Sequence, residues 1–454
     1  MKNTFLFLFS LSVMWEVNAQ SEAKNFTLRQ SIDYALANNT NIKNATIDEY
    51  IAKAKVGETT ALGLPQINGS VGLQHANPLR AFFGKGNGQP SLFAGGAVIP
   101  DGVVYSAPNF FQLPNSVDAS VTVTQLIFSS SYIIGLQAAK TYKALSAISK
   151  ENTQIQVIEN VTKAYYMYLV NVQRQNLFDA NIARLDSLLK QTKASSKAGF
   201  VEQIDVDRLE VTYNNLITER DKFTNMVILS GLLLKFQMGM PMSENLTLAD
   251  KIEAVSLDSN SVSSEAANFA NRAEYKMLET QLRLNTLNNK NNKYSFLPSI
   301  QASANLGRFT QSDKFDFFKN GHPWANYGVY SIGANIPIFD GLGKVKRVQQ
   351  SKLEVEKTEN SMNQFKQVVD MQAKTSELSF KNNIKSLKIQ QRNLNLAKEV
   401  ARVSQIKYKA GIGSNIEVIT AESSLKESQV NYYNALYDAI VAKVDYDKAL
   451  GNLK

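Results

Sequence analysis

The side chains best suited to acid–base or metal chemistry are few and far apart in this sequence. His75 and His322 are its only histidines, and it contains no cysteine. Neither histidine lies in a carboxylate pattern of the kind that a metal ion or a general base needs, so we expect both to be exposed residues near strand ends or loops. The serines Ser129–Ser131 show no nucleophile-elbow pattern. The sequence therefore predicts no enzyme, no metal site and no cofactor.

Phosphate and nucleic-acid ligands are not indicated either. The stretch GKGNGQ at Gly84–Gln89 lacks the Lys-Ser/Thr ending of a phosphate loop, and GLGK at Gly341–Lys344 lacks its spacing. The net charge of +9 is spread over 454 residues without a dense Lys/Arg block, so we expect no nucleic-acid partner.

The first residues resemble a secretory signal. Lys2 precedes the mostly apolar stretch Phe5–Trp15, and Val17-Asn18-Ala19 supplies a small-residue cleavage pattern. We assign residues 1–19 to a signal peptide, although a buried N-terminal helix is the alternative, and expect the mature chain outside the cytoplasm. The absence of cysteine excludes disulfides and a cysteine-linked lipid anchor.

The positions of the prolines predict two regions of long helix. None of the ten prolines lies between 115 and 240, and none follows 337. Proline in a helix interior costs about 3 kcal/mol, so long helices exclude it. Val161, Tyr165, Tyr168 and Val172 form a narrow apolar stripe of the coiled-coil type. A helix from Ser131 to Lys197 would extend about 100 Å, which suits a rod or a tube.

The chain repeats itself in the same order. Matching pairs of segments occur throughout: LPQINGS at Leu64–Ser70 with LPSIQAS at Leu297–Ser303, QLIFSSS at 125–131 with IPIFDGL at 336–342, and KAGFVEQIDV with KAGIGSNIEV. Such a pattern indicates two structural repeats. We place the first repeat at 20–240, a linker or equatorial segment at 241–261, and the second repeat at 262–454.

Each half also contains two stretches in which apolar and polar residues alternate. The clearest are Val117–Val123, Ile300–Leu306 and Tyr330–Ile336, and Ile67–Gln74 is weaker. Alternation predicts strands with one apolar and one polar face. Small polar residues on the second face are typical of outer-membrane barrel strands, but an ordinary half-solvated antiparallel sheet fits this pattern equally well.

A glycine interrupts each long helical region. Gly199 and Gly411 stand where a helix would end with a residue of positive φ, after which the chain reverses into a second helix. Each half then contains a helix, a strand, a long loop, a strand and a helical hairpin, and the hairpin turns lie at the far end from the strands.

These motifs resemble the TolC family of outer-membrane efflux proteins over nearly the whole mature chain. The resemblance rests on LPQINGSVGL, LPSIQASANLG, IPIFDGLGKVKRVQQSK and the two hairpin turns. It implies an α+β membrane protein: a homotrimer in which each chain gives four strands to a shared antiparallel β-barrel and long helices to a coiled-coil barrel. It also implies a location in the outer membrane with an extension into the periplasm. Geometry agrees, since four strands cannot close a barrel and open edges are not tolerated in lipid.

The resemblance implies a passive exit duct of a tripartite efflux or secretion system. Its partners would be a periplasmic adaptor protein, an inner-membrane transporter and outer-membrane lipid. By position, the gate residues would be Asp205, Tyr408 and Glu417. The residues that dock the adaptor would be those of the hairpin tips: Gly199, Phe200, Val201, Gly411, Ile412 and Gly413.

Two departures from the family pattern affect this assignment. Gly413 stands where some members have an arginine of the closing network, and Thr420 where some have a second aspartate. Asp205 and Glu417 also suit a second role, since carboxylates stabilise helix N-termini by about 0.3–1 kcal/mol. The alternative function is that of a secreted or periplasmic coiled-coil structural or adhesion protein, and the sequence does not identify an exported substrate.

Overall fold

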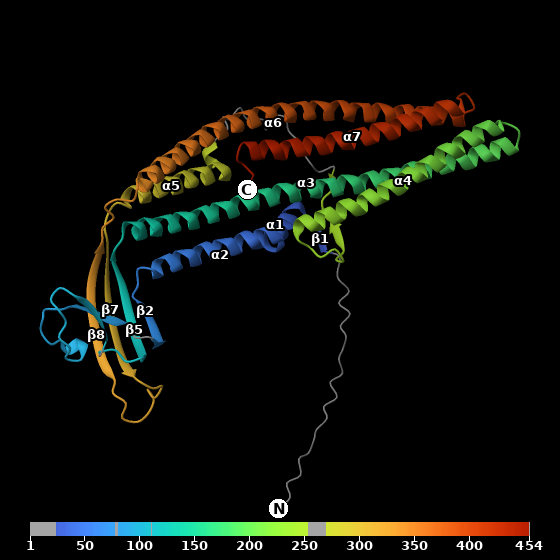
Figure 1. Ribbon diagram of the computed structural model, residues 1–454. Coiled ribbons are helices and arrows are strands. Elements are labelled where there is room, and N and C mark those ends of the chain that lie inside the picture. The colour runs from blue at the N-terminus through green and yellow to red at the C-terminus, as the bar shows by residue number, and fades with distance from the viewer. Residues whose placement is uncertain (1–23, 78–79, 110, 253–268, 454) are drawn as a thin grey trace, which may run out of the picture. The chain divides into compact units, whose positions relative to one another are not determined.

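The computed structural model describes residues 24–77, 80–109, 111–252 and 269–453 (Figure 1). The predicted signal peptide at 1–19 lies outside these residues, as does the end of the predicted linker. The chain forms two compact units, each assembled from both halves of the sequence. Among the described residues, the first unit comprises those within 24–48, 147–277 and 361–453, and the second comprises those within 49–146 and 278–360.

Helices make up most of the described chain. Their bounds are α1 (Leu28–Asn38), α2 (Thr40–Ala61), α3 (Ser130–Lys197), α4 (Gln203–Met238), α5 (Ala273–Tyr294), α6 (Gly343–Lys409) and α7 (Asn415–Ala449). The long helices α3 and α6 contain 68 and 67 residues, which confirms the prediction from the proline-free regions. Within the described residues, none of the helices has both the length and the apolar character needed to cross a membrane.

The apolar stripe of α3 contributes to two of the hydrophobic clusters of the first unit. Val161 and Tyr165 are fully buried in one cluster, and Phe178, Leu185 and Leu189 are buried in another nearer the hairpin turns. Beside the first cluster, β1 (Lys24–Phe26) pairs in parallel with β6 (Leu246–Leu248). The hydroxyl of Tyr165 donates to Asp250 Oδ2 at 2.7 Å, and burial together with this carboxylate raises the pKa of Tyr165 well above its usual value.

The second unit contains a four-stranded antiparallel sheet. Its strands are β2 (Gln66–His75), β5 (Asn115–Phe128), β7 (Ser299–Ser312) and β8 (Ala325–Asn335), in the order β2-β5-β7-β8. The predicted alternating stretches lie on these four strands, except that Ile336 is one residue beyond the end of β8. In the described chain, β2 and β8 are the edges of this sheet and each pairs on one side only.

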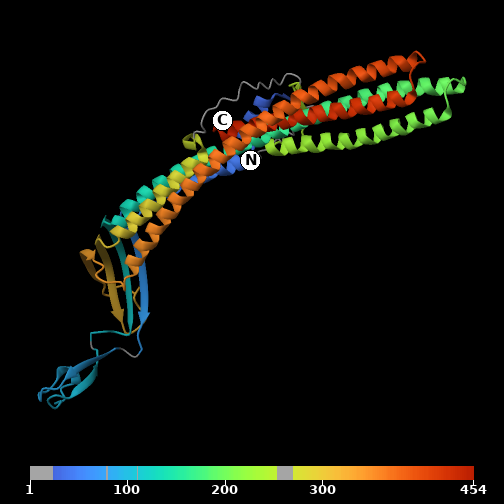
Figure 2. The same cartoon turned by 90° about the horizontal axis from the view of Figure 1, so that it is seen from above.

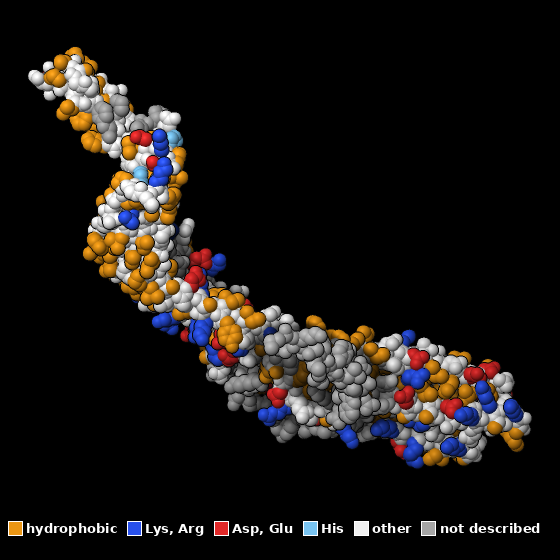
Figure 3. Space-filling view, turned by 90° about the horizontal axis from the view of Figure 1, so that it is seen from below, with side chains coloured by type: hydrophobic (Ala, Val, Ile, Leu, Met, Phe, Trp, Pro, Cys, Tyr) orange, Lys and Arg blue, Asp and Glu red, His pale blue; other side chains and the backbone are white. Residues whose placement is uncertain are grey.

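The register of the sheet places mainly apolar residues on one face and mainly small polar residues on the other. On the first face one row of partners is Val71, Ala119, Arg308 and Asn326, in which the last two are polar, and the next row is Gly69, Val121, Leu306 and Gly328. Rows of the opposite face contain Ser70 with Ser120, joined by a hydrogen bond of 2.9 Å, and Ser303 with Ser331, joined at 2.7 Å. Phe309 and Val329 are larger apolar members of that face. In Figure 3, hydrophobic side chains cover much of the surface of the sheet that faces the viewer.

Two features of the fold differ from the simple plan of the sequence. The loop at 79–116 contains a hairpin of β3 (Ala81–Lys85) and β4 (Val104–Pro108), within which the ring of Phe82 stacks on Phe93 at 4.8 Å. The first helical segment is also divided at Asn39, whose side-chain amide donates to the carbonyl of Gln237 at 2.7 Å. The break lies where the chain after α4 passes close to α1.

The expectation that both histidines are exposed is wrong for one of them. His75 ends β2 and is exposed, with Nδ1 at 2.7 Å from Asn115 Oδ1. The His322 side chain is only 11% exposed, because its ring packs against Phe317 and its Nε2 lies 2.7 Å from the Thr310 hydroxyl.

Candidate functional site at the tips of the helical hairpins

Two hairpins, α3–α4 and α6–α7, turn at the same end of the first unit (Figures 1 and 2). Gly199 has φ +80° and Gly411 has φ +75°, a backbone conformation that favours glycine. After each helix the turn closes with the same type of hydrogen bond. The N–H of Phe200 donates to the Ser195 carbonyl at 2.9 Å, and that of Ile412 donates to the Lys407 carbonyl at 3.1 Å. Both glycines therefore end their helices as predicted.

The residues after these glycines form the most exposed apolar points of the tips. Phe200 is 84% exposed and Ile412 is 79% exposed, and Ile204 and Ile416 are also exposed one turn further on. Val201 is half-buried. Exposed large apolar side chains at matching places in two hairpins suit a surface that contacts another protein.

Gly413 is required by close packing rather than by its φ angle. A Cβ at this position would lie 2.9 Å from Lys407 Cβ and 3.0 Å from the backbone nitrogen of Tyr408. The Gly413 N–H also donates to the Lys407 carbonyl at 3.1 Å. This turn therefore excludes any side chain, including the arginine that some members of the family have here, unless the end of α6 shifts.

The structure places the two tip carboxylates in the first turns of α4 and α7. Asp205 forms an ion pair with Arg208 at 3.4 Å. Glu417 is exposed, and its N–H donates to the hydroxyl of Ser414, the N-cap of α7, at 3.3 Å. No hydrogen bond or ion pair among the described residues joins the two carboxylates. Both positions are those of helix-stabilising acids.

Tyr408 connects the two hairpins. Its hydroxyl lies 3.0 Å from the Thr192 hydroxyl on α3, and its ring packs against the apolar cluster of α3 and α4. Thr192 is fully buried. This hydrogen bond therefore stabilises the contact between α6 and α3 close to the turns.

Sequence reasoning missed a second connection between the tips. Asn415 is 4% exposed, and its amide Nδ2 donates to the backbone carbonyl of Asp205 at 2.8 Å. Asn415 begins a buried stripe of α7 that continues through Val418, Ala421 and Leu425. The sequence signal for this residue is its position in the apolar stripe of α7, where an asparagine among apolar residues indicates a buried polar contact.

A layer of buried and partly buried polar side chains lies behind the tips. Glu422 of α7 accepts a hydrogen bond from Gln405 of α6 and pairs with Arg184 of α3 at 3.6 Å. One turn away, Asn181 donates to Gln429 at 2.9 Å. Because buried polar groups need their partners, this layer fixes how the hairpins lie against each other.

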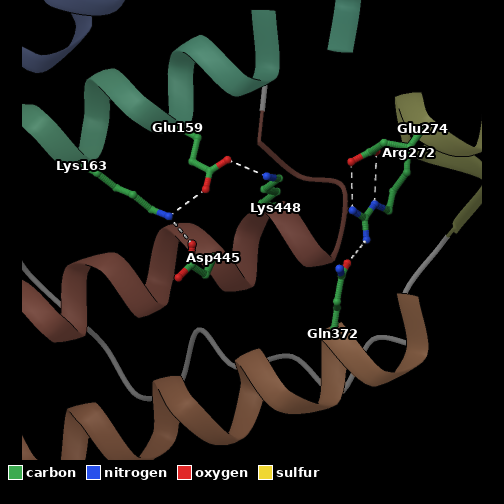
Figure 4. A network of polar contacts seen from close by, with 7 residues as sticks. All are labelled: Glu159, Lys163, Arg272, Glu274, Gln372, Asp445 and Lys448. Carbon is green, nitrogen blue, oxygen red and sulfur yellow. Dashed lines mark hydrogen bonds and ion pairs between the residues drawn. The ribbon is translucent and has the colours of Figure 1, made fainter. Parts of the chain in front are cut away.

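A second polar network lies farther from the tips in the first unit (Figure 4). Glu159 of α3 pairs with Lys163 at 2.7 Å and with Lys448 of α7 at 2.6 Å, and Lys163 also pairs with Asp445 at 2.6 Å. Burial alone would raise the pKa of Glu159, but the hydrogen bonds from both lysines outweigh it and hold the pKa below its usual value. Arg272 of the same network pairs with Glu274 at 3.0 Å.

The network lines a cavity of about 480 Å³ whose other walls come from α6 and α7. Opposite charges balance within it, and every charged group named above has a partner. Nowhere in the described residues do three or more His, Cys, Asp or Glu side chains gather as a metal would require. We therefore interpret this network as a connection between α3, α7 and the start of α5.

This chain is similar to a family model, to curated proteins and to solved structures that are described as outer-membrane proteins. Residues 269–452 match the family model of the "Outer membrane efflux protein". The chain is 22% identical over 328 residues to the probable efflux pump outer membrane protein TtgC of Pseudomonas putida, covering 69% of this chain and 64% of that protein. It is 23% identical over 339 residues to the solvent efflux pump outer membrane protein SrpC of Pseudomonas putida, covering 73% and 70%. The chain thus spans less than two thirds of the length of TtgC.

Solved structures share the fold of nearly the whole chain. The Campylobacter jejuni CmeC outer membrane channel superposes with a TM-score of 0.75 at 16% identity, covering 100% of this chain and 95% of that one. A membrane protein from Pseudomonas aeruginosa gives a TM-score of 0.75 at 15% identity, covering 95% and 93%. At these identities the likeness establishes the fold, a helical part joined to a β-domain.

Proposed function

We propose that the chain is the outer-membrane exit duct of a tripartite efflux system. Residues 269–452 belong to the outer membrane efflux protein family, as the sequence motifs indicated. The protein lies in the outer membrane and extends into the periplasm. Substrates would pass through it without an energy source of its own, driven by an inner-membrane transporter and a periplasmic adaptor.

The sheet with two unpaired edges carries the proposal. In β2, Ile67, Val71 and Leu73 are exposed on one face, and in β8 so are Tyr330 and Ile332. Exposed apolar area costs about 25 cal/mol per Å² in water, but the same residues are stable against lipid. The opposite face carries serines, threonines and asparagines, which suit a water-filled lumen.

The unpaired edges make a second copy of the chain necessary. In lipid every backbone N–H and C=O needs a partner, so β8 of one copy would pair with β2 of the next. Three copies with the four strands of this sheet would form a barrel of about twelve strands, wide enough to enclose water. We therefore propose a homotrimer in which the two halves of each chain act as structural repeats.

The hairpin tips would form the gate and the docking surface for the adaptor. Asn415 with the Asp205 carbonyl, and Tyr408 with Thr192, are bonds between hairpins that would have to break if the tips moved apart. Phe200 and Ile412 would contact the adaptor, together with the turn residues beside them. Asp205 and Glu417 would add negative charge to the entrance, which favours cations.

The native mass of the detergent-extracted protein tests the proposal. An isolated outer-membrane fraction should yield a particle close to three mature chains, and this particle should conduct ions in planar bilayers. A monomer or dimer recovered without detergent from the soluble fraction would contradict the shared barrel. It would favour a secreted coiled-coil protein, in which the four strands form an ordinary half-solvated sheet.

A further inference from the structure

The junction between the sheet and the helices of the second half carries a concentrated positive charge. Its cations come from the last turns of α5 and the first turns of α6: Lys290, Lys293, Lys344, Lys346 and Arg347. Asp340 is the one carboxylate in the segments 290–296 and 336–347. Asp340 accepts a hydrogen bond from the N–H of Lys344 at 2.9 Å and pairs with Arg347 at 3.4 Å. Within the described residues, the four lysines of this group form no ion pair.

Exposed apolar and aromatic side chains lie among these cations. Ile338 is 94% exposed and Phe339 is 79% exposed, directly after the end of β8. Phe296 is exposed just before β7, and the ammonium of Lys344 lies 5.6 Å from the centre of its ring. The ammonium of Lys290 lies 5.7 Å from the ring of Tyr294 in the same way. We call these five cations, with Tyr294, Phe296, Ile338 and Phe339, the basic collar.

The first half of the chain supplies an internal control. The segments QLIFSSS and IPIFDGL correspond, so Lys344 and Lys346 stand where the first half has Ile133 and Gly135. Likewise, Lys290 and Lys293 correspond to Gly57 and Thr60 through the LPQINGS and LPSIQAS matches. Both junctions join a strand to a long helix, although the first has none of these cations. The fold of the junction therefore does not require them.

Local electrostatics also oppose this arrangement. The N-terminal end of a helix favours carboxylates, but α6 has no acidic residue in its first turn and begins with three cations. Repulsion between these like charges and the positive end of the helix dipole both disfavour this arrangement. A cluster that the fold neither needs nor favours indicates an external negative partner. Aromatic rings interleaved with lysines at the end of membrane strands are typical of the boundary between lipid tails and headgroups.

We infer that the basic collar binds the phosphate groups of anionic phospholipids in the leaflet of the outer membrane that faces the periplasm. The inference rests on the proposed function, because only a sheet that spans the membrane places the collar at this boundary. The lysines and Arg347 contact the phosphates, and Phe296, Ile338 and Phe339 lie among the upper parts of the acyl chains. The corresponding junction of the first half lacks this preference, so each chain contributes one such site.

The test is titration of the purified trimer in neutral detergent with phosphatidylglycerol or phosphatidylcholine, with the lipids retained per trimer counted by native mass spectrometry. The trimer should retain about three phosphatidylglycerol molecules, one for each chain, and should discriminate against phosphatidylcholine. The triple variant Lys290→Gln, Lys344→Gln, Lys346→Gln should weaken this retention on the order of 100-fold, since each cation near an anionic headgroup contributes about fivefold. Replacement of the same lysines by arginine should preserve it.

A matched control is the triple variant Lys385→Gln, Lys388→Gln, Lys398→Gln. These exposed lysines lie in the part of α6 that belongs to the first unit and are not collar residues, and their loss changes the net charge equally. Equal loss of lipid in both variants would overturn the inference, as would equal retention of both lipids by the unaltered trimer. Displacement of the lipid by millimolar inorganic phosphate would also overturn it, because the collar would then be a simple anion site. If no trimer forms at all, the proposed function fails instead.

Discussion

Replacement of Asn415 by alanine should open the hairpin tips. The amide of Asn415 donates to the Asp205 carbonyl at 2.8 Å, and its Oδ1 has no partner among the described residues. The substitution therefore removes one hydrogen bond and leaves no newly unpaired side chain on the other hairpin. The net loss is about 1 kcal/mol per chain, the usual contribution of a neutral hydrogen bond.

Three chains that open together would multiply this loss. A change of about 3 kcal/mol shifts the equilibrium between closed and open tips by on the order of 100-fold. Single-channel recording in planar bilayers should then show a clear rise in the open fraction or conductance of Asn415→Ala. Gln203→Ala is the matched control, because Gln203 is the corresponding residue of the first tip but is exposed and bonds only Asp207 within its own helix. Indistinguishable recordings from Asn415→Ala and the unaltered channel would refute the reasoning.

Three further predictions concern the tips and the polar network. The double variant Asp205→Ala, Glu417→Ala should change ion selectivity or block by divalent cations in bilayers, and unchanged values would remove both residues from the pore. Gly413→Ala should destabilise the end of α6, because its Cβ would meet backbone atoms, and hydrogen exchange at the turn should rise by on the order of tenfold or more. The pKa of Glu159 is lowered from 4.5 in the folded protein, so its stabilising effect is present above pH 4.5 and is lost as pH falls through the lowered value. Thermal unfolding should therefore depend less on pH below 4.5 in Glu159→Gln than in the unaltered protein.

Controls for these variants come from the same chain. Gly57 lies in α2, where a Cβ added to it would meet no other atom within 4 Å, so Gly57→Ala should not raise hydrogen exchange there. If it raises exchange as much as Gly413→Ala does, close packing is not the cause. For the pH dependence, Glu58→Gln removes an exposed carboxylate outside the network. A pH profile of Glu58→Gln that matches that of Glu159→Gln would contradict the role of the network.

Features set by local rules could be predicted from the sequence. Proline-free regions gave α3 and α6, alternation gave the four strands, and Gly199 and Gly411 gave the helix ends, because each rule acts within a few residues. The β3–β4 hairpin was missed, since its five-residue strands carry no clear alternation.

The contacts that hold the candidate site together depend on pairs far apart in the chain. Asn415 meets the Asp205 carbonyl and Thr192 meets Tyr408 only after the hairpins pack. His322 is enclosed for a similar reason, since its partner Thr310 precedes it by a loop. No periodicity within a helix or strand reports such pairs, so they could not be read from the sequence by these rules.

In the proposed trimer, the two unpaired edges of the sheet would also affect how the amount of channel depends on the amount of protein made. The shared barrel would form only when three chains meet, so its yield at low abundance would rise with about the third power of chain concentration. A modest increase in synthesis would therefore raise export capacity more than proportionally. Chains made below that level would remain unassembled, with the β2 and β8 edges open to periplasmic proteases and chaperones. The number of channels per cell would thus stay low at low expression and rise steeply, rather than in proportion, once expression increases.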